Sequence, residues 1–194
     1  MGAAQVVAVA GPAGTFCDLL ALGLRDHGAL TTTMDDTRPI DAVVHSCVDP
    51  RAFLRSPLVE LGDGAWDERC EAVLRTALDT CRVAHSRLVS RLVFVTPAFS
   101  LDGAPGYAPY AAALEGVRAM AKSAARQWGL TGTTVNCVAP ALEGGPVPTE
   151  RMALGRIPDA RVEVAAVVAF LLSDAASGVT GATITVDGGS LMRP

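Results

Sequence analysis

Short runs of consecutive apolar residues alternate along the chain with longer stretches in which apolar positions recur every three or four residues. The short runs are rich in β-branched residues, which is typical of strands covered on both faces of a sheet. They predict strands at residues 5–10, 29–34, 40–48, 91–96, 133–138 and 182–186.

The stretches with helical spacing lie between these runs and predict helices at residues 18–27, 66–89, 110–128 and 162–172. Alternation of strand and helix implies parallel strands joined by right-handed crossovers. We therefore expect one α/β domain over residues 1–194, a Rossmann-like doubly wound parallel sheet with helices on both faces. Its ligand crevice should lie at the C-terminal ends of the strands.

Composition narrows the possible partners. The 194 residues are 50% hydrophobic and carry 16 basic against 20 acidic side chains, for a net charge of −4. Without a run of Lys and Arg to neutralise phosphates, nucleic acid is not expected as a partner. The longest apolar run, at residues 165–172, is well short of the roughly 18 residues of a membrane span. The N-terminal residues lack the basic side chains with which a secretory signal peptide begins. We therefore expect a cytoplasmic protein without membrane attachment.

The side chains that commonly bind metals are scattered. The 5 cysteines and 3 histidines form no CxxC pair and show no metal-ligand spacing. We expect reduced, mostly buried thiols and no metal site.

Two segments resemble the short-chain dehydrogenase/reductase family. Residues 110–136 (YAAALEGVRAMAKSAARQWGLTGTTVN) follow its YxxxK helix and "VN" strand, and residues 154–189 end in its FL-SD-AS-TG-VDGG pattern. The N-terminal half fits more loosely. The resemblance implies the same fold, but the chain between residues 34 and 40 is too short for the family's usual helix, strand and helix. We expect one edge strand and its helices to be missing.

The resemblance implies a catalytic site that this chain lacks in large part. The family uses a Tyr as general acid or base, a Lys four residues later, a Ser thirteen residues earlier and a relay Asn. Tyr110 occupies the Tyr position, but Leu114 stands at the Lys position and Pro97 at the Ser position. The alternative register on Tyr107 places Ala111 at the Lys position. The only asparagine is needed in the "VN" strand, and the only lysine, Lys122, lies about 18 Å along the helix from Tyr110.

An unassisted tyrosine keeps a pKa near 10 and is a poor base at neutral pH. We favour Tyr110 as a helix residue hydrogen-bonded to backbone over Tyr110 as a catalytic group. The other interpretation pairs Tyr110 with Ser100 as a residual oxidoreductase.

The family's TGxxxGxG loop is also altered. Gly11 remains, Thr15 and Cys17 replace the second and third glycines, and Gly14 lies one position early. Asp35 stands where NAD-preferring members hold the ribose hydroxyls, although a solvated turn residue explains it equally well. The resemblance therefore implies no cofactor, or NAD(H) held weakly by Gly11, Gly14, Thr15 and Asp35.

These features favour a pseudo-enzyme: a non-catalytic subunit of an active NAD(P)-dependent dehydrogenase/reductase paralogue, or a self-associating chain. The family's assembly surfaces would be the helices at 66–89 and 110–128 and the segment 162–194. Two alternatives stay open. One is a weak NAD(H)-dependent oxidoreductase of a hydroxy or keto substrate that uses Tyr110. The other is a module that binds an acyl or aromatic ligand without turnover.

Overall fold

Six parallel strands form one sheet in the order β2-β1-β3-β4-β5-β6 in the computed structural model, which describes residues 4–192. All six predicted strands are confirmed, with bounds shifted by a few residues. They are β1 (Val6–Ala10), β2 (Leu30–Thr32), β3 (Ala42–Ser46), β4 (Arg91–Val95), β5 (Thr134–Pro140) and β6 (Thr183–Val186).

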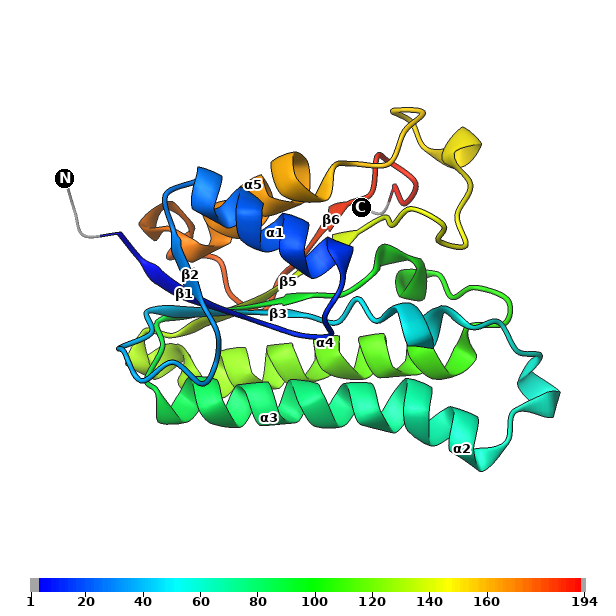
Figure 1. Cartoon of the computed structure of the whole chain (residues 1–194), viewed down its shortest axis with the longest axis horizontal. Coiled ribbons are helices and arrows are strands. Elements are labelled where there is room, and N and C mark those ends of the chain that lie inside the picture. The colour runs from blue at the N-terminus through cyan, green and yellow to red at the C-terminus, as the bar shows by residue number, and fades with distance from the viewer. Residues whose placement is uncertain (1–3, 193–194) are drawn as a thin grey trace.

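Helices cover both faces of this sheet (Figure 1). One layer contains α1 (Thr15–Asp26) and α5 (Ala165–Leu172), and the other contains α3 (Ala72–Ser86) and α4 (Ala108–Trp128). Successive residues of β4 alternate between the two layers: Leu92 and Phe94 face α3 and α4, whereas Val93 and Val95 face α1 and α5. The doubly wound α/β fold predicted from the apolar pattern is confirmed.

The predicted helices differ from the observed ones mainly at their beginnings. The helix expected at 66–89 comprises α2 (Asp63–Trp66), a π-helical turn (Asp67–Glu71) and α3. A second π-helical turn (Ala160–Val164) leads into α5. Within residues 4–192, none of the helices has both the length and the apolar character that crossing a membrane requires.

The connection from β2 to β3 confirms the expected loss of an edge strand. β2 ends at Thr32 and β3 begins at Ala42, with neither helix nor strand between them. β2 is therefore the outer strand on this side of the sheet. The residues that follow β1, β3, β4 and β5 all emerge at the same edge, because the strands are parallel. The candidate site lies at this edge.

Candidate functional site

Tyr110 lies in the first turn of α4 and is fully buried, with 0% of its surface exposed. Its hydroxyl donates a hydrogen bond to the carbonyl oxygen of Cys47, at 2.5 Å, and accepts one from the backbone N–H of Asp49, at 3.1 Å. Both partners belong to the segment that follows β3. The hydroxyl that the resemblance makes catalytic is thus bonded to backbone on both its donor and its acceptor side.

Aromatic rings surround Tyr110. The ring centroids of Phe53 and Phe99 lie 5.2 Å and 5.7 Å from that of Tyr110, and both rings also contact Tyr107. Phe53 ends a 3-10 turn (Pro50–Phe53), and Phe99 belongs to another (Ala98–Leu101). The sequence analysis missed this four-ring cluster, because its members come from three segments far apart along the chain.

Burial raises the pKa of the Tyr110 hydroxyl well above its ordinary value, and the Asp49 N–H bond opposes this only in part. A phenolate in an apolar environment loses its hydration, so the neutral form is favoured. The direction is opposite to the one that a general base at neutral pH requires. Burial outweighs the Asp49 N–H bond, so this environment favours the neutral Tyr110 hydroxyl.

The other family positions are occupied by residues with structural contacts. Leu114, at the lysine position, is fully buried in the core beneath the sheet. Asn136 lies in β5, where its side-chain amide donates to the carbonyl of Val179 and accepts from the N–H of Ala182. Ser100 donates to the carbonyl of Pro97, at 3.1 Å. The contacts of Ser100 therefore do not support the residual oxidoreductase, since its hydroxyl is not bonded to Tyr110.

Arg118 is a buried cation that the sequence analysis missed. It lies two turns after Tyr110 on α4 and is 3% exposed. Its guanidinium donates to the carbonyls of Thr96 and Pro97, at 3.0 Å each, to Ser100 Oγ at 2.5 Å, and to Glu115. It thereby fixes the loop after β4. Arg118 follows Tyr110 and Leu114 at intervals of four residues, on the face of α4 that is otherwise apolar. This spacing could have predicted that the Arg118 side chain is buried.

Gly11 follows β1 and has a left-handed φ of 132°. A Cβ at this position would lie 2.2 Å from the carbonyl oxygen of Ser46, so glycine is required by contact with the neighbouring strand. Gly14 also has a positive φ, 154°, and precedes Thr15, the first residue of α1. The backbone at the helix N-terminus is therefore retained, although Asp18 places a negative charge in its first turn.

The structure places Asp35 in an exposed turn after β2. Its neighbour Asp36 is the carboxylate with defined partners: it accepts from the Thr32 hydroxyl and from the backbone and side chain of Arg38, at 2.6 Å for the closest guanidinium nitrogen. These bonds lower the pKa of Asp36. Asp36 is thus bonded within the turn, whereas Asp35 is exposed to solvent.

Two large cavities open at this edge of the sheet. The first, here called the α3 cavity, has a volume of about 390 Å³ and lies against α3 and the ends of β1 and β3. The second, the loop cavity, has a volume of about 740 Å³ and lies between the start of α1 and the loop after β5. Gly11 lines the α3 cavity, Thr15 lines the loop cavity, and Asp35 lines neither.

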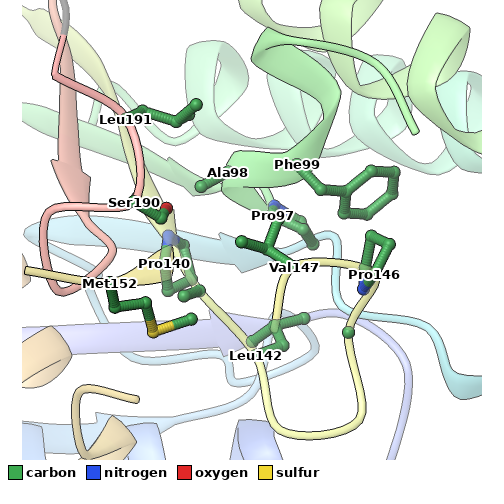
Figure 2. A pocket seen from close by; sticks show the side chains of 12 residues that line it. Pro97, Ala98, Phe99, Pro140, Leu142, Pro146, Val147, Met152, Ser190 and Leu191 are labelled. Carbon is green, nitrogen blue, oxygen red and sulfur yellow. The ribbon is translucent and has the colours of Figure 1, made fainter. Parts of the chain in front are cut away.

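Near Pro97, at the family's serine position, there is only a small void of about 20 Å³, room for roughly one water molecule. Figure 2 shows it enclosed by side chains from the loops after β4 and β5 and from the C-terminal segment. Pro97, Leu142 and Val147 are among the apolar groups that close it.

The part of the chain that the structure describes contains no cluster of His, Cys, Asp and Glu able to hold a metal ion. All five cysteines are free, and four of them are buried. Burial raises the pKa of Cys81 to about 11 and that of Cys137 to about 12. These thiols are packing residues in their protonated form.

Comparison with known proteins assigns the chain to a family. A family model described as enoyl-(acyl carrier protein) reductase matches residues 26–190. The chain belongs to the short-chain dehydrogenase/reductase family.

Its relatives include reductases of similar sequence. The 3-oxoacyl-[acyl-carrier-protein] reductase MabA of Mycobacterium tuberculosis is 32% identical over 191 residues, which cover 91% of this chain and 75% of MabA. FabG of Salmonella typhimurium, which carries the same description, is 29% identical over 192 residues, covering 89% and 77%. A solved structure titled "Dehalogenation enzyme" superimposes with a TM-score of 0.79, covering 97% of this chain and 98% of that one, at 21% identity. This last similarity concerns the fold.

Within this short-chain dehydrogenase/reductase, the residues present fit a nicotinamide dinucleotide poorly. Leu114 offers no cation where the family's lysine holds the ribose, and Thr15 and Cys17 stand where the family's loop has its second and third glycines. Thr15 and the first N–H groups of α1 could still approach a phosphate. Gly11, Gly14 and the N-terminus of α1 are the parts of the family's phosphate-binding loop that this chain retains.

Proposed function

We propose that this chain is a non-catalytic short-chain dehydrogenase/reductase subunit that works within a larger assembly. The observation that carries the proposal is the Tyr110 hydroxyl, which is fully buried and bonded to the backbone of Cys47 and Asp49. A general acid or base must reach the reacting atom directly or through one water molecule. Tyr110 reaches only backbone.

Surface features support assembly. On the side of α3 and α4 away from the sheet lies a groove of about 530 Å³ whose lining includes Leu78, Met120 and Trp128. On the opposite side of the molecule, α5 (AAVVAFLL) is apolar over its whole circumference, and its Phe170 is 44% exposed. Exposed apolar surface of this kind marks contacts with other chains. We propose that the groove and the segment 162–192 contact an active paralogue or a second copy, since an isologous interface requires only a similar surface on the partner.

The proposal is tested by purifying the tagged protein from its native cell and measuring its mass by light scattering. We expect a species heavier than the 20.0 kDa chain, containing a stoichiometric short-chain dehydrogenase/reductase partner or a second copy. Ala119→Arg, in the groove, should release a folded 20.0 kDa monomer.

The control is Leu30→Arg, which adds the same side chain at an exposed position of β2, the edge strand at the opposite end of the sheet from β6. It should leave the assembly intact. A wild-type chain that runs as a stable 20.0 kDa monomer, with no partner in the cell, contradicts the proposal.

A second function, binding of a small ligand without turnover, is favoured by the two cavities. The loop cavity has apolar walls that include Phe16, Leu19 and Ile157. The α3 cavity combines apolar and hydrogen-bonding groups.

A further inference from the structure

Two neighbouring turns at one end of the molecule each carry an exposed leucine. Leu88 follows α3 and is 86% exposed, and Leu130 follows α4 and is 100% exposed. The turns are neighbours because they lead into β4 and β5, which pair in register from Arg91 and Thr134 onward. Both leucines therefore lie at the N-terminal ends of the strands, the end opposite to the Tyr110 edge (Figure 1).

Leu88 has a backbone conformation that leucine rarely adopts. Its φ is 54°, in the left-handed region, and its N–H donates to the His85 carbonyl, at 3.1 Å. Glycine is the usual residue directly after the C-cap of a helix, here Arg87, because a side chain is disfavoured in this conformation. The Leu88 side chain is too exposed for packing within the chain to offset this cost. A bulky apolar group held here indicates a contact outside the chain.

Basic residues surround the two turns. Residues 80–101 and 116–142 contain no Asp or Glu, although the chain has 20 acidic residues. Three basic residues, Arg82, Lys122 and Arg126, are exposed on the last two turns of α3 and α4. We call this region, together with the two leucine turns, the basic end. All the basic residues of the two stretches are Arg82, Arg87, Arg91, Arg118, Lys122 and Arg126.

Most carboxylates near the basic end are already paired. The ion pairs there are Asp79–Arg82, Asp174–Arg91 and Asp36–Arg38, at 2.8 Å, 3.5 Å and 2.6 Å. Asp35, in the turn that contains Asp36, is exposed. These pairs involve neither Lys122 nor Arg126, so the α4 side of the basic end keeps its positive charge.

We propose that the basic end docks on an anionic lipid surface. Leu88 and Leu130 enter the boundary between headgroups and acyl chains, and Lys122 and Arg126 contact lipid phosphates. Anionic lipids attract basic side chains at the surface, and apolar groups on the same face are buried beneath the headgroups. A bilayer takes up protruding side chains without a complementary shape, whereas an acidic protein would need a groove that matches both turns.

This contact is peripheral and requires no membrane span. The expectation of no membrane attachment rested on the short apolar run at residues 165–172 and on the lack of a secretory signal, neither of which bears on a surface contact. The inference does not depend on the proposed assembly, because neither leucine lines the groove between α3 and α4.

The test is sedimentation of the full chain with phosphatidylcholine vesicles that contain about one third phosphatidylserine. We expect the protein to bind these vesicles at about 0.1 M salt, and to bind pure phosphatidylcholine at least about tenfold more weakly. Raising the salt to about 0.5 M should weaken binding, because the added ions screen the lipid phosphates.

Trp128 reports which end of the molecule meets the lipid. It is the last residue of α4 and lines, with Leu88, a cavity of about 280 Å³ between the two turns. The other tryptophan, Trp66, lies at the end of α2, before the start of α3. In Trp66→Phe chains, lipids brominated in their acyl chains should quench the Trp128 fluorescence. In Trp128→Phe chains, the Trp66 fluorescence should not change.

Two matched double substitutions locate the contact. Leu88→Ser with Leu130→Ser should weaken vesicle binding at least about tenfold. Leu58→Ser with Val59→Ser, at positions 68% and 93% exposed in the segment before α2, should leave binding within about twofold of wild type. Leu88→Gly relieves the left-handed backbone, so it should raise Tm while it weakens vesicle binding.

Three results overturn the proposal: no binding to the anionic vesicles at millimolar lipid, undiminished binding by the Leu88→Ser, Leu130→Ser chain, or quenching of Trp66 in place of Trp128. After the first result, an acidic protein surface becomes the occupant to test. Failure of the proposed function has a different signature, a 20.0 kDa monomer in light scattering without vesicles. The two failures are therefore distinguishable.

Discussion

At the scale of single residues, one buried hydroxyl binds two backbone groups of a neighbouring segment. The Tyr110 hydroxyl satisfies two buried backbone groups, the Cys47 carbonyl and the Asp49 N–H. In Tyr110→Phe the ring packing remains, but both groups lose their partner inside the core. A buried unsatisfied group costs about 1 to 3 kcal/mol. We expect urea denaturation to show a loss of this size in the free energy of unfolding.

Tyr107→Phe is the matched control. Tyr107 belongs to the same aromatic cluster, but its hydroxyl makes no hydrogen bond within residues 4–192. This substitution should change the free energy of unfolding by less than about 0.5 kcal/mol. Equal costs for the two variants would show that the Tyr110 hydroxyl bonds contribute nothing to stability.

His45 should make stability depend on pH. Burial depresses its folded pKa to about 4, whereas an unfolded histidine titrates near 6.5. The unfolded state therefore binds the proton more strongly, and stability falls as the pH drops from about 6.5 to about 4. The full loss is about 3 kcal/mol, at 1.36 kcal/mol per pKa unit. Urea midpoints measured across this range give the profile.

His45→Asn keeps a polar atom near Thr80, but the asparagine does not titrate. The decrease in stability that His45 causes between about pH 6.5 and about pH 4 should therefore disappear in this variant. His27→Gln, at an exposed position, should retain the wild-type profile. An unchanged profile in His45→Asn would assign the acid sensitivity to other groups.

At the scale of elements, the crossing of α1 over the π-helical turn at Ala160–Val164 depends on one glycine. A Cβ at Gly23 would lie 2.1 Å from the carbonyl oxygen of Arg161 and 2.4 Å from the Ala165 Cβ. Both are rigid groups, so Gly23→Ala must push the helices apart. Overpacking of this kind costs about 1 to 3 kcal/mol or more. Thermal unfolding should show a large drop in Tm.

Gly129→Ala provides the control at the end of α4. Its φ of −58° suits any residue, and a Cβ there meets nothing within 4 Å. This change should be neutral or stabilise the fold by up to about 1 kcal/mol. If Gly23→Ala behaved like Gly129→Ala, the close approach of α1 and the turn would be refuted.

Elements were also what the sequence predicted best. Apolar runs such as residues 91–96 identify buried strands without any tertiary information, and the observed β4 lies within that range. The beginnings of helices were less accurate. α1 begins at Thr15, three residues before the predicted start, because Gly14 supplies no side-chain cap that would signal the helix N-terminus.

For the candidate site, the sequence predicted only which of the family's catalytic residues are absent. The missing lysine and serine are visible as Leu114 and Pro97 in the sequence. The contacts that replace them join residues far apart along the chain: Tyr110 bonds Cys47, and Arg118 bonds Thr96. No local pattern encodes such pairs. These contacts were therefore not predictable from the sequence.

At the scale of the whole molecule, the fold of a reductase family is retained, and the Tyr110 hydroxyl at the catalytic edge is bonded to backbone. The sheet, both helical layers and the outer groove of α3 and α4 are present. The void beside Pro97 has a volume of about 20 Å³. We infer that an assembly containing this chain uses the active site of another subunit.

The most direct test of this account is the reductase activity, per assembled complex, of complexes that contain the Tyr110→Phe chain. We predict activity within about twofold of wild type, whereas the same substitution in the YxxxK tyrosine of the active partner should abolish it. Positioned acid–base groups contribute about 10² to 10⁴ in rate. A loss of a hundredfold or more on Tyr110→Phe, with the complex still assembled, would make Tyr110 catalytic and contradict the account.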